Sequence, residues 1–330
     1  MPASIKDVAR LACVSTSTAS NILNNKGYAS DDTRKKVLLA AKKLNYKPNA
    51  LARGLVTGAS KTVGVLIPDL SDPYFTEIVR GVDECARENE YSVILCNTDR
   101  DIFKERFYFK NLNERRVDGI IFSGSGREDD RYTVEEEDLS SVVVIGNHNT
   151  AFSTCQVDNV QAADDITTFL LERNHKRIGL ISGPLEYMIS TDRLKGYQRA
   201  LLNRGIPYDP MLVIEENFKE TAGQRAAEKL LRLPEELRPT AIIAQNDQMA
   251  VGAISAAWII GLQIPKDVAI VGFDDIPIAS LTCPPLTTVR LPMHQMGYNA
   301  MNMIIEGKKE LEFKKKKMVM QHEIIVRGTT

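Results

Sequence analysis

The sequence is poor in the residue patterns that build metal centres, disulfide frameworks and membrane spans. Its five cysteines are an odd number and include no Cys-x-x-Cys pair, which predicts reduced thiols. Its four histidines are dispersed and form no His-Glu-x-x-His segment, so we expect neither a metal nor a cofactor. The longest apolar stretch, near residues 250–262, is too short to span a bilayer, and no charged-then-apolar leader begins the chain. These absences predict a cytoplasmic protein that does not enter membranes.

The composition is that of an ordinary soluble protein, but its charges are unevenly distributed. The chain has 330 residues, enough for two or three domains, of which 43% are hydrophobic and 26% charged. Residues 1–58 include ten basic and three acidic residues and carry a net charge of +7, whereas the remainder carries −8. This asymmetry is expected when only the head meets phosphate groups. It favours nucleic-acid binding by the head over the alternative of a merely solvated basic bundle.

Residues 4–44 predict three short helices. Ser4 and Asp7 form a capping pair that starts the first helix, whose apolar residues recur at helical spacing. A tight turn follows, after which Ser15 caps a second helix and Ser30 caps a third, basic helix. The first two helices have the layout of a helix-turn-helix, a unit that places its second helix in the major groove of DNA.

The outward side of the second helix carries short polar side chains, namely Thr16, Ser17, Thr18 and Asn21. Hydroxyl groups on short stems can reach base edges or phosphates, and an asparagine can bind adenine through two hydrogen bonds. Taken alone, such residues are common on any protein surface. Their position in a basic helix-turn-helix favours contact with DNA.

Beyond residue 59 the chain alternates short β-rich runs with helical stretches. We expect one parallel sheet from residues 62–69, 91–99, 119–124 and 142–146, and a second from 178–183, 212–215, 241–246 and 268–274. Helices are expected at 73–89, 191–204 and 247–260, and an alternating strand at 318–326. Repeated strand–helix units predict an α/β fold, in which ligands bind at the carboxyl ends of the strands. The polar residues that end these strands are therefore candidate ligand contacts: Asp69, Asn97, Ser123, Asn147, Asn246 and Asp274.

A larger set of head residues falls at spacings typical of one protein family: Ile5, Lys6, Asp7, Val8, Ala9, Val14, Ser15, Ser20, Leu23, Asn24, Thr33, Arg34, Val37, Ala40, Leu44, Tyr46, Pro48, Asn49 and Ala52. This pattern resembles the lactose-repressor/galactose-repressor family of bacterial transcription regulators, over essentially the full length. The resemblance implies an all-α helix-turn-helix domain at 1–47, a hinge helix and linker at 48–60, and a two-lobed core at 61–330 with parallel sheets, like a periplasmic binding protein. Lobe 1 would comprise about 61–159 and 290–318, and lobe 2 about 160–289 and 319–330.

The resemblance also implies how the head binds DNA. In the family the second helix enters the major groove, while a hinge helix enters the minor groove and a leucine levers the duplex open. Such a wedge unstacks bases at a cost of a few kcal/mol, which the bent duplex offsets. The implied DNA contacts are Thr16, Ser17 and Asn21 to bases, Ser4, Ser15, Thr18, Asn24, Tyr28, Ser30 and Asn49 to phosphates or backbone, Ala52 and Arg53 in the hinge, and Leu55 as the wedge.

Three residues of the head depart from the family pattern. Cys13 stands where glycine is usual in the turn, and a non-glycine residue at positive φ costs roughly 1 kcal/mol. Asn21 replaces the arginine or histidine of many members, which predicts a different base preference. Gly54 lies in the hinge helix and weakens it by about 1 kcal/mol relative to alanine. The hinge is therefore expected to order less readily without DNA.

For the core, the resemblance implies an effector held between the lobes. Arginine donors and aspartate acceptors suit vicinal sugar hydroxyls, and an aromatic ring suits the apolar face of a sugar. The implied effector-binding residues are Tyr74, Phe75, Ser123, Asn147, Arg193, Phe218, Asn246 and Asp274. As lone residues, Asp274 would be read as a helix cap, Arg193 as a surface cation and Phe218 as part of the core. Trp258 is predicted to lie in the core or at a subunit interface.

We interpret the chain as a nucleoid-associated transcriptional repressor and not as an enzyme. It is expected to bind palindromic double-stranded operator DNA as a homodimer, because one small helix pair buries too little surface to be specific. The heptad tail that builds tetramers in the family is missing, which favours a dimer. A plain sugar is the favoured effector, with sugar phosphates, sugar acids and nucleobases as alternatives, and either induction or co-repression fits.

Two interpretations from other classes are less favoured. A periplasmic-type solute receptor, whose basic head would be fortuitous, would need the leader that we do not find, and the expected free thiols also argue against it. A sugar-modifying α/β enzyme would need an acid–base constellation or a phosphate-binding loop, and the sequence offers neither.

Overall fold

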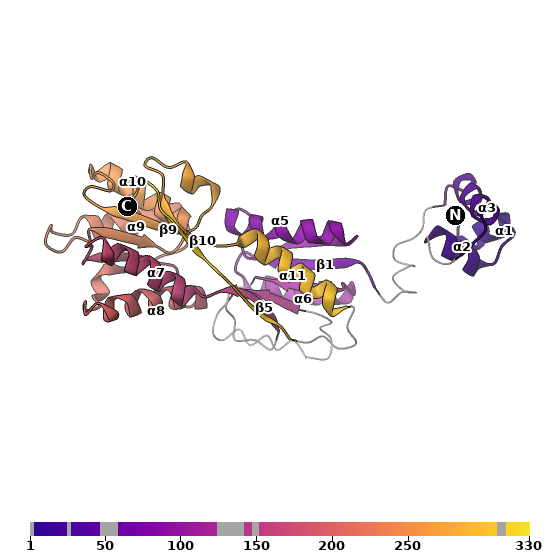
Figure 1. The fold of residues 1–330 in the computed structure, drawn as a ribbon, viewed down its shortest axis with the longest axis horizontal. Coiled ribbons are helices and arrows are strands. Elements are labelled where there is room, and N and C mark those ends of the chain that lie inside the picture. Colours follow the sequence, from indigo (N-terminus) through magenta and orange to yellow (C-terminus); the bar gives the residue numbers. More distant parts are fainter. Residues whose placement is uncertain (1–2, 25–27, 47–58, 124–141, 147–151, 309–314) are drawn as a thin grey trace. The chain divides into compact units, whose positions relative to one another are not determined.

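The computed structural model describes residues 3–24, 28–46, 59–123, 142–146, 152–308 and 315–330 (Figure 1). By its internal contacts the chain divides into a head unit, residues 1–60, and a core unit, residues 61–330. The described part of the head unit consists of helices joined by turns, whereas the core unit alternates strands and helices. The α/β architecture expected for the core is thus confirmed.

The head unit contains α1 (Ile5–Leu11), α2 (Thr16–Leu23) and α3 (Asp31–Lys43). All three helices begin where the sequence predicts. The Asp7 carboxylate accepts hydrogen bonds from the Ser4 backbone N–H and hydroxyl, at 3.0 and 2.6 Å, while the hydroxyls of Ser15 and Ser30 accept from backbone N–H groups in the first turns of α2 and α3. Apolar residues of the three helices form a small shared core: Val8, Ala9, Ala12, Ala19, Ile22, Val37, Ala40 and Ala41.

The turn between α1 and α2 contains Cys13 with φ of 53°, the left-handed conformation expected at that position. Its side chain is exposed. Cys13 therefore adopts the left-handed backbone conformation, which a glycine would adopt without strain.

The first lobe of the core unit is built on a six-stranded parallel sheet of order β11-β5-β4-β3-β1-β2. Its strands are β1 (Thr62–Ile67), β2 (Ser92–Asn97), β3 (Gly119–Phe122), β4 (Val142–Ile145), β5 (Ser153–Val157) and β11 (Lys317–Met320). Alternate β1 residues pack on opposite faces, with Val65 in the cluster of α5 (Pro73–Glu88) and α11 (Met293–Gly307) and Leu66 in that of α6 (Ile102–Glu114). Both faces of this sheet are therefore buried.

The second lobe is built on a six-stranded sheet of order β12-β10-β9-β8-β6-β7, parallel except for the antiparallel pair β10–β12. Its strands are β6 (Ile178–Ser182), β7 (Val213–Glu215), β8 (Ala241–Ala244), β9 (Ala269–Asp274), β10 (Thr287–Arg290) and β12 (Glu323–Ile325). Four helices flank it: α7 (Asn159–Glu172), α8 (Met188–Asn203), α9 (Glu220–Leu231) and α10 (Asp247–Ile260). Short 3-10 turns at Pro210–Leu212 and Pro277–Ser280 complete the lobe.

The chain passes between the two lobes three times. Single short connections join β5 to α7, β10 to α11, and β11 to β12, the last drawn in yellow in Figure 1. Because each sheet receives a strand from the C-terminal segment, neither lobe is continuous in sequence. Residues 318–326, expected as one strand, are thus two strands in different sheets, and that prediction was wrong. Helix α8 also begins three residues earlier than expected.

In two helix pairs, each helix contributes a glycine at a point where the two backbones touch. A Cβ atom added at Gly252 of α10 would lie 2.0 Å from the Glu220 carbonyl oxygen of α9, and one at Gly223 would lie 2.2 Å from the Met249 carbonyl oxygen. The pair α5 and α11 repeats this arrangement: a Cβ atom added at Gly81 or at Gly297 would lie 1.9 Å from a carbonyl oxygen of the other helix. Glycine at these positions is required by helix approach rather than by backbone conformation.

Candidate functional site

The exposed side of α2 presents a row of polar side chains. Thr16, Ser17 and Asn21 are exposed, whereas Thr18 is half-buried. The Ser15 hydroxyl lies 2.7 Å from the Ser17 hydroxyl and 2.8 Å from the Thr18 hydroxyl, so these three groups form one local network. Of the residues expected to read bases, Thr16 and Asn21 therefore lie exposed outside this network.

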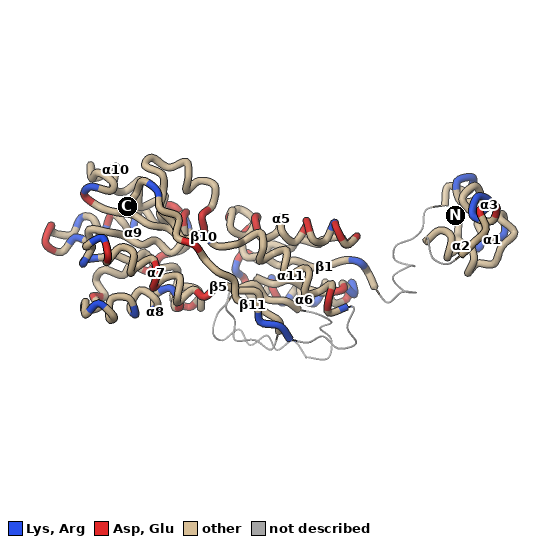
Figure 2. Tube along the Cα trace, viewed as in Figure 1, with Lys and Arg blue, Asp and Glu red and all other residues tan. Residues whose placement is uncertain are grey.

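The other predicted DNA contacts of the head lie around α2 or outside the described residues. Ser4 and Ser30 are exposed N-caps, Tyr28 is fully exposed, and the Asn24 amide donates to the Ser20 carbonyl oxygen at 2.8 Å. Asn49, Ala52, Arg53 and Leu55, together with Gly54, fall outside the described residues. Lys and Arg residues occur along α1 and α3 (Figure 2), and such positive charge favours binding to phosphate groups.

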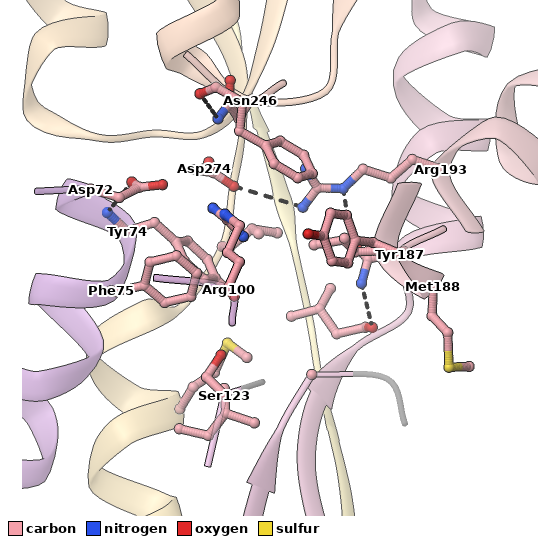
Figure 3. A pocket seen from close by; sticks show the side chains of 18 residues that line it. Asp72, Tyr74, Phe75, Arg100, Ser123, Tyr187, Met188, Arg193, Asn246 and Asp274 are labelled. Carbon is pink, nitrogen blue, oxygen red and sulfur yellow. Dashed lines mark hydrogen bonds and ion pairs between the residues drawn. The ribbon is translucent and has the colours of Figure 1, made fainter. Parts of the chain in front are cut away.

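In the core unit, one cavity of about 840 Å³, including space open to solvent, lies between the two lobes. It brings together seven of the eight predicted effector contacts: Tyr74, Phe75, Ser123, Arg193, Phe218, Asn246 and Asp274 (Figure 3). The eighth, Asn147, falls outside the described residues. Ser123 follows β3 and Asp274 ends β9, so the cavity occupies the carboxyl ends of strands, as expected for this fold.

Arg193 lies on α8 and is almost completely buried. Its Nε donates to Asn159 at 2.9 Å and its Nη1 donates to the Gln245 carbonyl oxygen. Its Nη2 lies 3.7 Å from Asp274 and has no hydrogen-bond partner in the described part of the chain. A buried donor left without a partner is unfavourable, so this group is available to a ligand.

The carboxylate of Asp274 faces Arg193 from the end of β9. Burial raises the pKa of Asp274 well above its usual range, and the neighbouring guanidinium acts in the opposite direction. The backbone of Asp274 has φ of 108°, an uncommon conformation for a residue with a side chain. Such conformations persist only where the surrounding structure holds them, and they cluster at ligand sites.

Aromatic rings from both lobes surround the cavity. Phe218 lies in the loop before α9, and its ring centroid is 6.1 Å from that of Tyr187 at an interplanar angle of 42°. Tyr74 and Phe75 begin α5 in the first lobe, with centroids 5.0 Å apart. A Cβ atom added at Gly183 would meet the Phe218 ring at 2.2 Å, so glycine there leaves room for it.

Several cavity residues were not predicted from the sequence. Asp72, Arg100, Asn159, Tyr187 and Met296 line the cavity as well. Asp72 and Arg100 could have been predicted as cavity residues from the sequence, because each follows the carboxyl end of a first-lobe strand. Two candidates chosen by that same rule, Asp69 and Asn97, lie outside the cavity lining, which corrects their assignment.

Asp69 instead links the lobes. Lys219, at the start of α9, places its Nζ 2.6 Å from the Asp69 carboxylate and 3.3 Å from the Ser71 hydroxyl. Hydrogen bonds from Lys219 and Ser71 outweigh burial and lower the pKa of Asp69 to about 2. Because this pKa is depressed, the contribution to stability is present above pH 3.8, the unfolded value, and is lost as the pH falls toward 2.

We expect Lys219→Ala to weaken this link only modestly, because the side chains are 45% and 22% exposed. Exposed pairs contribute about 0.2–1 kcal/mol, and salt screens them. Urea unfolding of Lys219→Ala, Asp69→Asn and the double variant should give a coupling energy in that range at neutral pH, which shrinks in high salt and at pH 2. A coupling energy of zero, or one insensitive to salt, would show that the lobes are not linked by this pair.

Within the described ranges, no three histidine, cysteine, aspartate or glutamate side chains are grouped so that they could hold a metal ion. Every helix in those ranges is too short or too polar to traverse a bilayer.

Comparison with known proteins places both units in one family. Residues 4–49 match the bacterial regulatory proteins of the lacI family, and residues 167–330 match the periplasmic binding protein-like domain. The HTH-type transcriptional regulator RegA of Clostridium saccharobutylicum is 38% identical, over 100% of both chains. The lac repressor dimer bound to operator and the anti-inducer ONPF is 26% identical with a TM-score of 0.89, over 100% of this chain and 99% of that one.

A third comparison concerns a ligand complex. The transcriptional regulator CelR–cellobiose complex is 27% identical with a TM-score of 0.73, over 99% of this chain and 100% of that one. The relatives are transcriptional regulators and not enzymes, in agreement with the sequence interpretation. With a full-length relative at 38% identity and the helix-turn-helix and two-lobed core both in place, this chain belongs to the lacI family of DNA-binding transcription regulators.

Proposed function

We propose that the protein is a transcriptional repressor that binds a palindromic operator as a homodimer and responds to a sugar or sugar derivative held between its lobes. One observation carries the proposal: a chain with a helix-turn-helix head also contains a cavity in which a buried arginine, a buried carboxylate and aromatic rings converge. DNA binding of this kind takes place in the cytoplasm, at the chromosome.

The chemistry of the cavity supports a carbohydrate effector. Arg193 offers an unpaired N–H and Asp274 offers carboxylate oxygens, which complement the hydroxyls of a sugar. Phe218 and Tyr187 offer ring faces for the apolar side of a pyranose. Asn246 is partly committed, because its Oδ1 accepts from the Met249 N–H and its Nδ2 donates to the Phe218 carbonyl oxygen. The related CelR was observed with cellobiose.

The three short connections between the lobes suggest how the effector acts. A ligand that contacts both lobes favours one angle between them and so biases the state of the segment that leads to the head. Coupling of 1–3 kcal/mol would change operator affinity by roughly 5–150-fold. The related lac repressor was observed with operator and an anti-inducer bound together.

A homodimer fits the exposed apolar surface of the second lobe. Trp258 on α10 is 81% exposed and Leu281 is 75% exposed, so Trp258 is not part of the core as one interpretation had it. Aromatic residues such as tryptophan are enriched in protein–protein interfaces relative to the rest of the surface. Two copies would also double the small recognition surface of the head.

Among the proposed DNA contacts, Asn21→Ala tests the recognition role of α2. We expect a loss of about 1–3 kcal/mol in affinity for the preferred operator, with little change for non-specific DNA, because a base contact discriminates whereas phosphate contacts do not. Gel-shift titrations at fixed salt measure both affinities, with Asn203→Ala, an exposed asparagine of the core unit, as the matched control. Equal losses on both DNAs would contradict base recognition by Asn21.

Selection of bound genomic fragments followed by footprinting tests the proposed function as a whole. The expected result is a two-fold symmetric footprint, a dimer in sedimentation experiments, and a thermal shift with at least one carbohydrate of a broad panel. A monomer without any salt-sensitive preference among fragments would overturn the proposal.

A further inference from the structure

We propose that the effector is an anion, and that Arg100 binds its carboxylate or phosphate group. The inference rests on the proposed function, since it assigns a chemical class to the ligand of the same cavity. It narrows that class from sugars in general to acidic ring compounds, such as sugar acids and sugar phosphates.

Arg100 reaches the cavity from the first lobe. It lies between β2 and α6, directly before Asp101, the N-cap of α6. Its guanidinium carbon is 5.0 Å from the ring centroid of Phe218 and 5.9 Å from those of Phe75 and Tyr187. Figure 3 shows the side chain extending into the middle of the cavity, among rings that come from both lobes.

No acid in the described part of the chain lies close enough to Arg100 to form an ion pair, and Asp72 interacts with its charge only at longer range. No hydrogen bond joins Arg100 to another described residue, and its guanidinium lies among aromatic rings. Burial raises the pKa of Asp72, and the charge of Arg100 acts in the opposite direction. The two carboxylates of the cavity have their direct partners elsewhere. Asp274 faces Arg193, and Asp72 accepts a hydrogen bond from the Tyr74 N–H at 3.0 Å as the cap of α5.

The two arginines of the cavity therefore differ in their role. Arg193 is held by Asn159, the Gln245 carbonyl oxygen and Asp274, and it offers one remaining N–H. Arg100 offers its whole donor edge, because cation–π contacts use the face of the guanidinium and leave its in-plane N–H groups unoccupied. That edge has the fork geometry that binds a carboxylate or phosphate through two parallel hydrogen bonds.

When a ligand excludes water from the cavity, the charge of Arg100 determines whether a neutral or an anionic ligand binds more favourably. A neutral ligand that fills the cavity would displace water from Arg100 without supplying a counter-charge, which is unfavourable. An anionic ligand supplies that charge in a site of low dielectric, where the pairing is strongest. The cavity thus discriminates between neutral and acidic forms of one ring compound.

The backbone holds Arg100 in an uncommon conformation. Asp99 and Arg100 have φ of 55° and 59°, in the left-handed region that non-glycine residues seldom occupy. The Asp99 carboxylate accepts a hydrogen bond from the Asn97 amide at 2.5 Å and pairs with Lys104, which fixes the turn. The side chain is therefore directed into the cavity before any ligand binds.

Calorimetric titration of the full-length protein with matched ring compounds tests the proposal. The probes are glucose, glucuronate and glucose 6-phosphate, with galactose, galacturonate and galactose 6-phosphate as a second series, so that the carboxylate and phosphate arms distinguish the two sources of negative charge. We expect at least one acid to bind tenfold or more tightly than its neutral partner. In Arg100→Gln this preference should fall about ten- to a hundredfold, with an intermediate loss in Arg100→Lys.

Arg173→Gln is the matched control, because its guanidinium also stacks on a ring, 3.5 Å from the Phe169 centroid, but lies outside the cavity lining. A second readout uses inorganic phosphate alone, which should raise the melting temperature of the wild type and of Arg173→Gln but not of Arg100→Gln at equal ionic strength.

The outcomes separate the two proposals. Binding of neutral sugars as tight as that of their acids, or a preference that survives in Arg100→Gln, would overturn the anionic effector and leave a sugar-responsive repressor. Equal stabilisation of the wild type and Arg100→Gln by phosphate would also overturn it. Failure of every neutral and acidic probe, with no phosphate effect, would count against both.

Discussion

Replacement of Asp274 by alanine is expected to lower the affinity for the effector at least a hundredfold while the protein still binds operator. The carboxylate is a buried group of the cavity and faces Arg193, 3.7 Å away. Hydrogen bonds that involve a charged group contribute about 1.5–3 kcal/mol each, so the loss of two acceptor oxygens removes several kcal/mol. Asp274→Asn, which keeps the size of the side chain and one oxygen, should show a smaller loss. Operator gel shifts with increasing effector measure the response.

Asp275→Ala provides the matched control. Asp275 is also largely buried and ion-paired, to Arg290 at 2.7 Å and to Arg327 at 2.6 Å, but it does not line the cavity. Its loss should lower stability and spare the response. If Asp274→Ala responds at the same effector concentration as the wild type, the effector binds somewhere other than this cavity.

Gly252→Ala is expected to destabilise the second lobe by about 2 kcal/mol or more. In an isolated helix the same change stabilises by about 1 kcal/mol, because alanine has the higher helix propensity. In this protein the new Cβ atom would lie 2.0 Å from the Glu220 carbonyl oxygen, so α9 and α10 must move apart along their whole contact. Overpacking of this kind costs 1–3 kcal/mol even when flexible side chains absorb it. Thermal unfolding followed by circular dichroism measures the change.

Gly252→Ala is expected to lower the stability of the protein, although the same change would stabilise an isolated helix. Gly205→Ala serves as the control, because its φ is +67° and no atom lies within 4 Å of the added Cβ, so it should cost only the 1–2 kcal/mol of a left-handed residue. Gly81→Ala, at the equivalent contact of α5 with α11, should match Gly252→Ala. A rise in melting temperature for Gly252→Ala would contradict the direct backbone contact.

The head could be predicted closely because its signals are local. Helices α2 and α3 each begin at a serine whose hydroxyl accepts a hydrogen bond from a backbone N–H. At the start of α1 the acceptor is the Asp7 carboxylate, which binds Ser4. Each of these capping contacts spans only three residues. The turn at Cys13 likewise depends on one backbone conformation. Such features are written into consecutive residues, so no knowledge of distant contacts is needed.

The strands of the core were predicted where they are apolar and missed where they are not. β5 contains Ser153, Thr154 and Gln156, all of them buried, and a strand of buried polar residues gives no hydrophobic pattern. The division of residues 317–325 between two sheets could not be predicted either. It depends on which strands have an edge free to accept a further strand, and these are β5 in one sheet and β10 in the other.

The cavity was predicted as far as its residues end strands or match the family pattern. The sequence did not predict Arg100 as a cavity residue, because the direction of its side chain depends on two consecutive residues in the left-handed conformation. The sequence Asp99-Arg100-Asp101 does not indicate that conformation. Asp69 was misassigned because a charged residue at a strand end can serve a partner across the cleft, here Lys219, as readily as a ligand. The position of a residue along the chain indicates that it lies near the cavity, but only tertiary packing determines whether its side chain faces the cavity.

The interleaving of the lobes has a consequence for how the protein is made. Each sheet takes an edge strand from a segment that follows all its other strands in sequence, β11 for the first lobe and β12 for the second. Contacts between such distant segments slow folding, since loop closure must precede them. A ribosome that has produced 300 residues therefore carries two unfinished sheets with open edges. Translation must reach residue 320 before the first lobe can complete its hydrogen-bond ladder, and residue 325 before the second can.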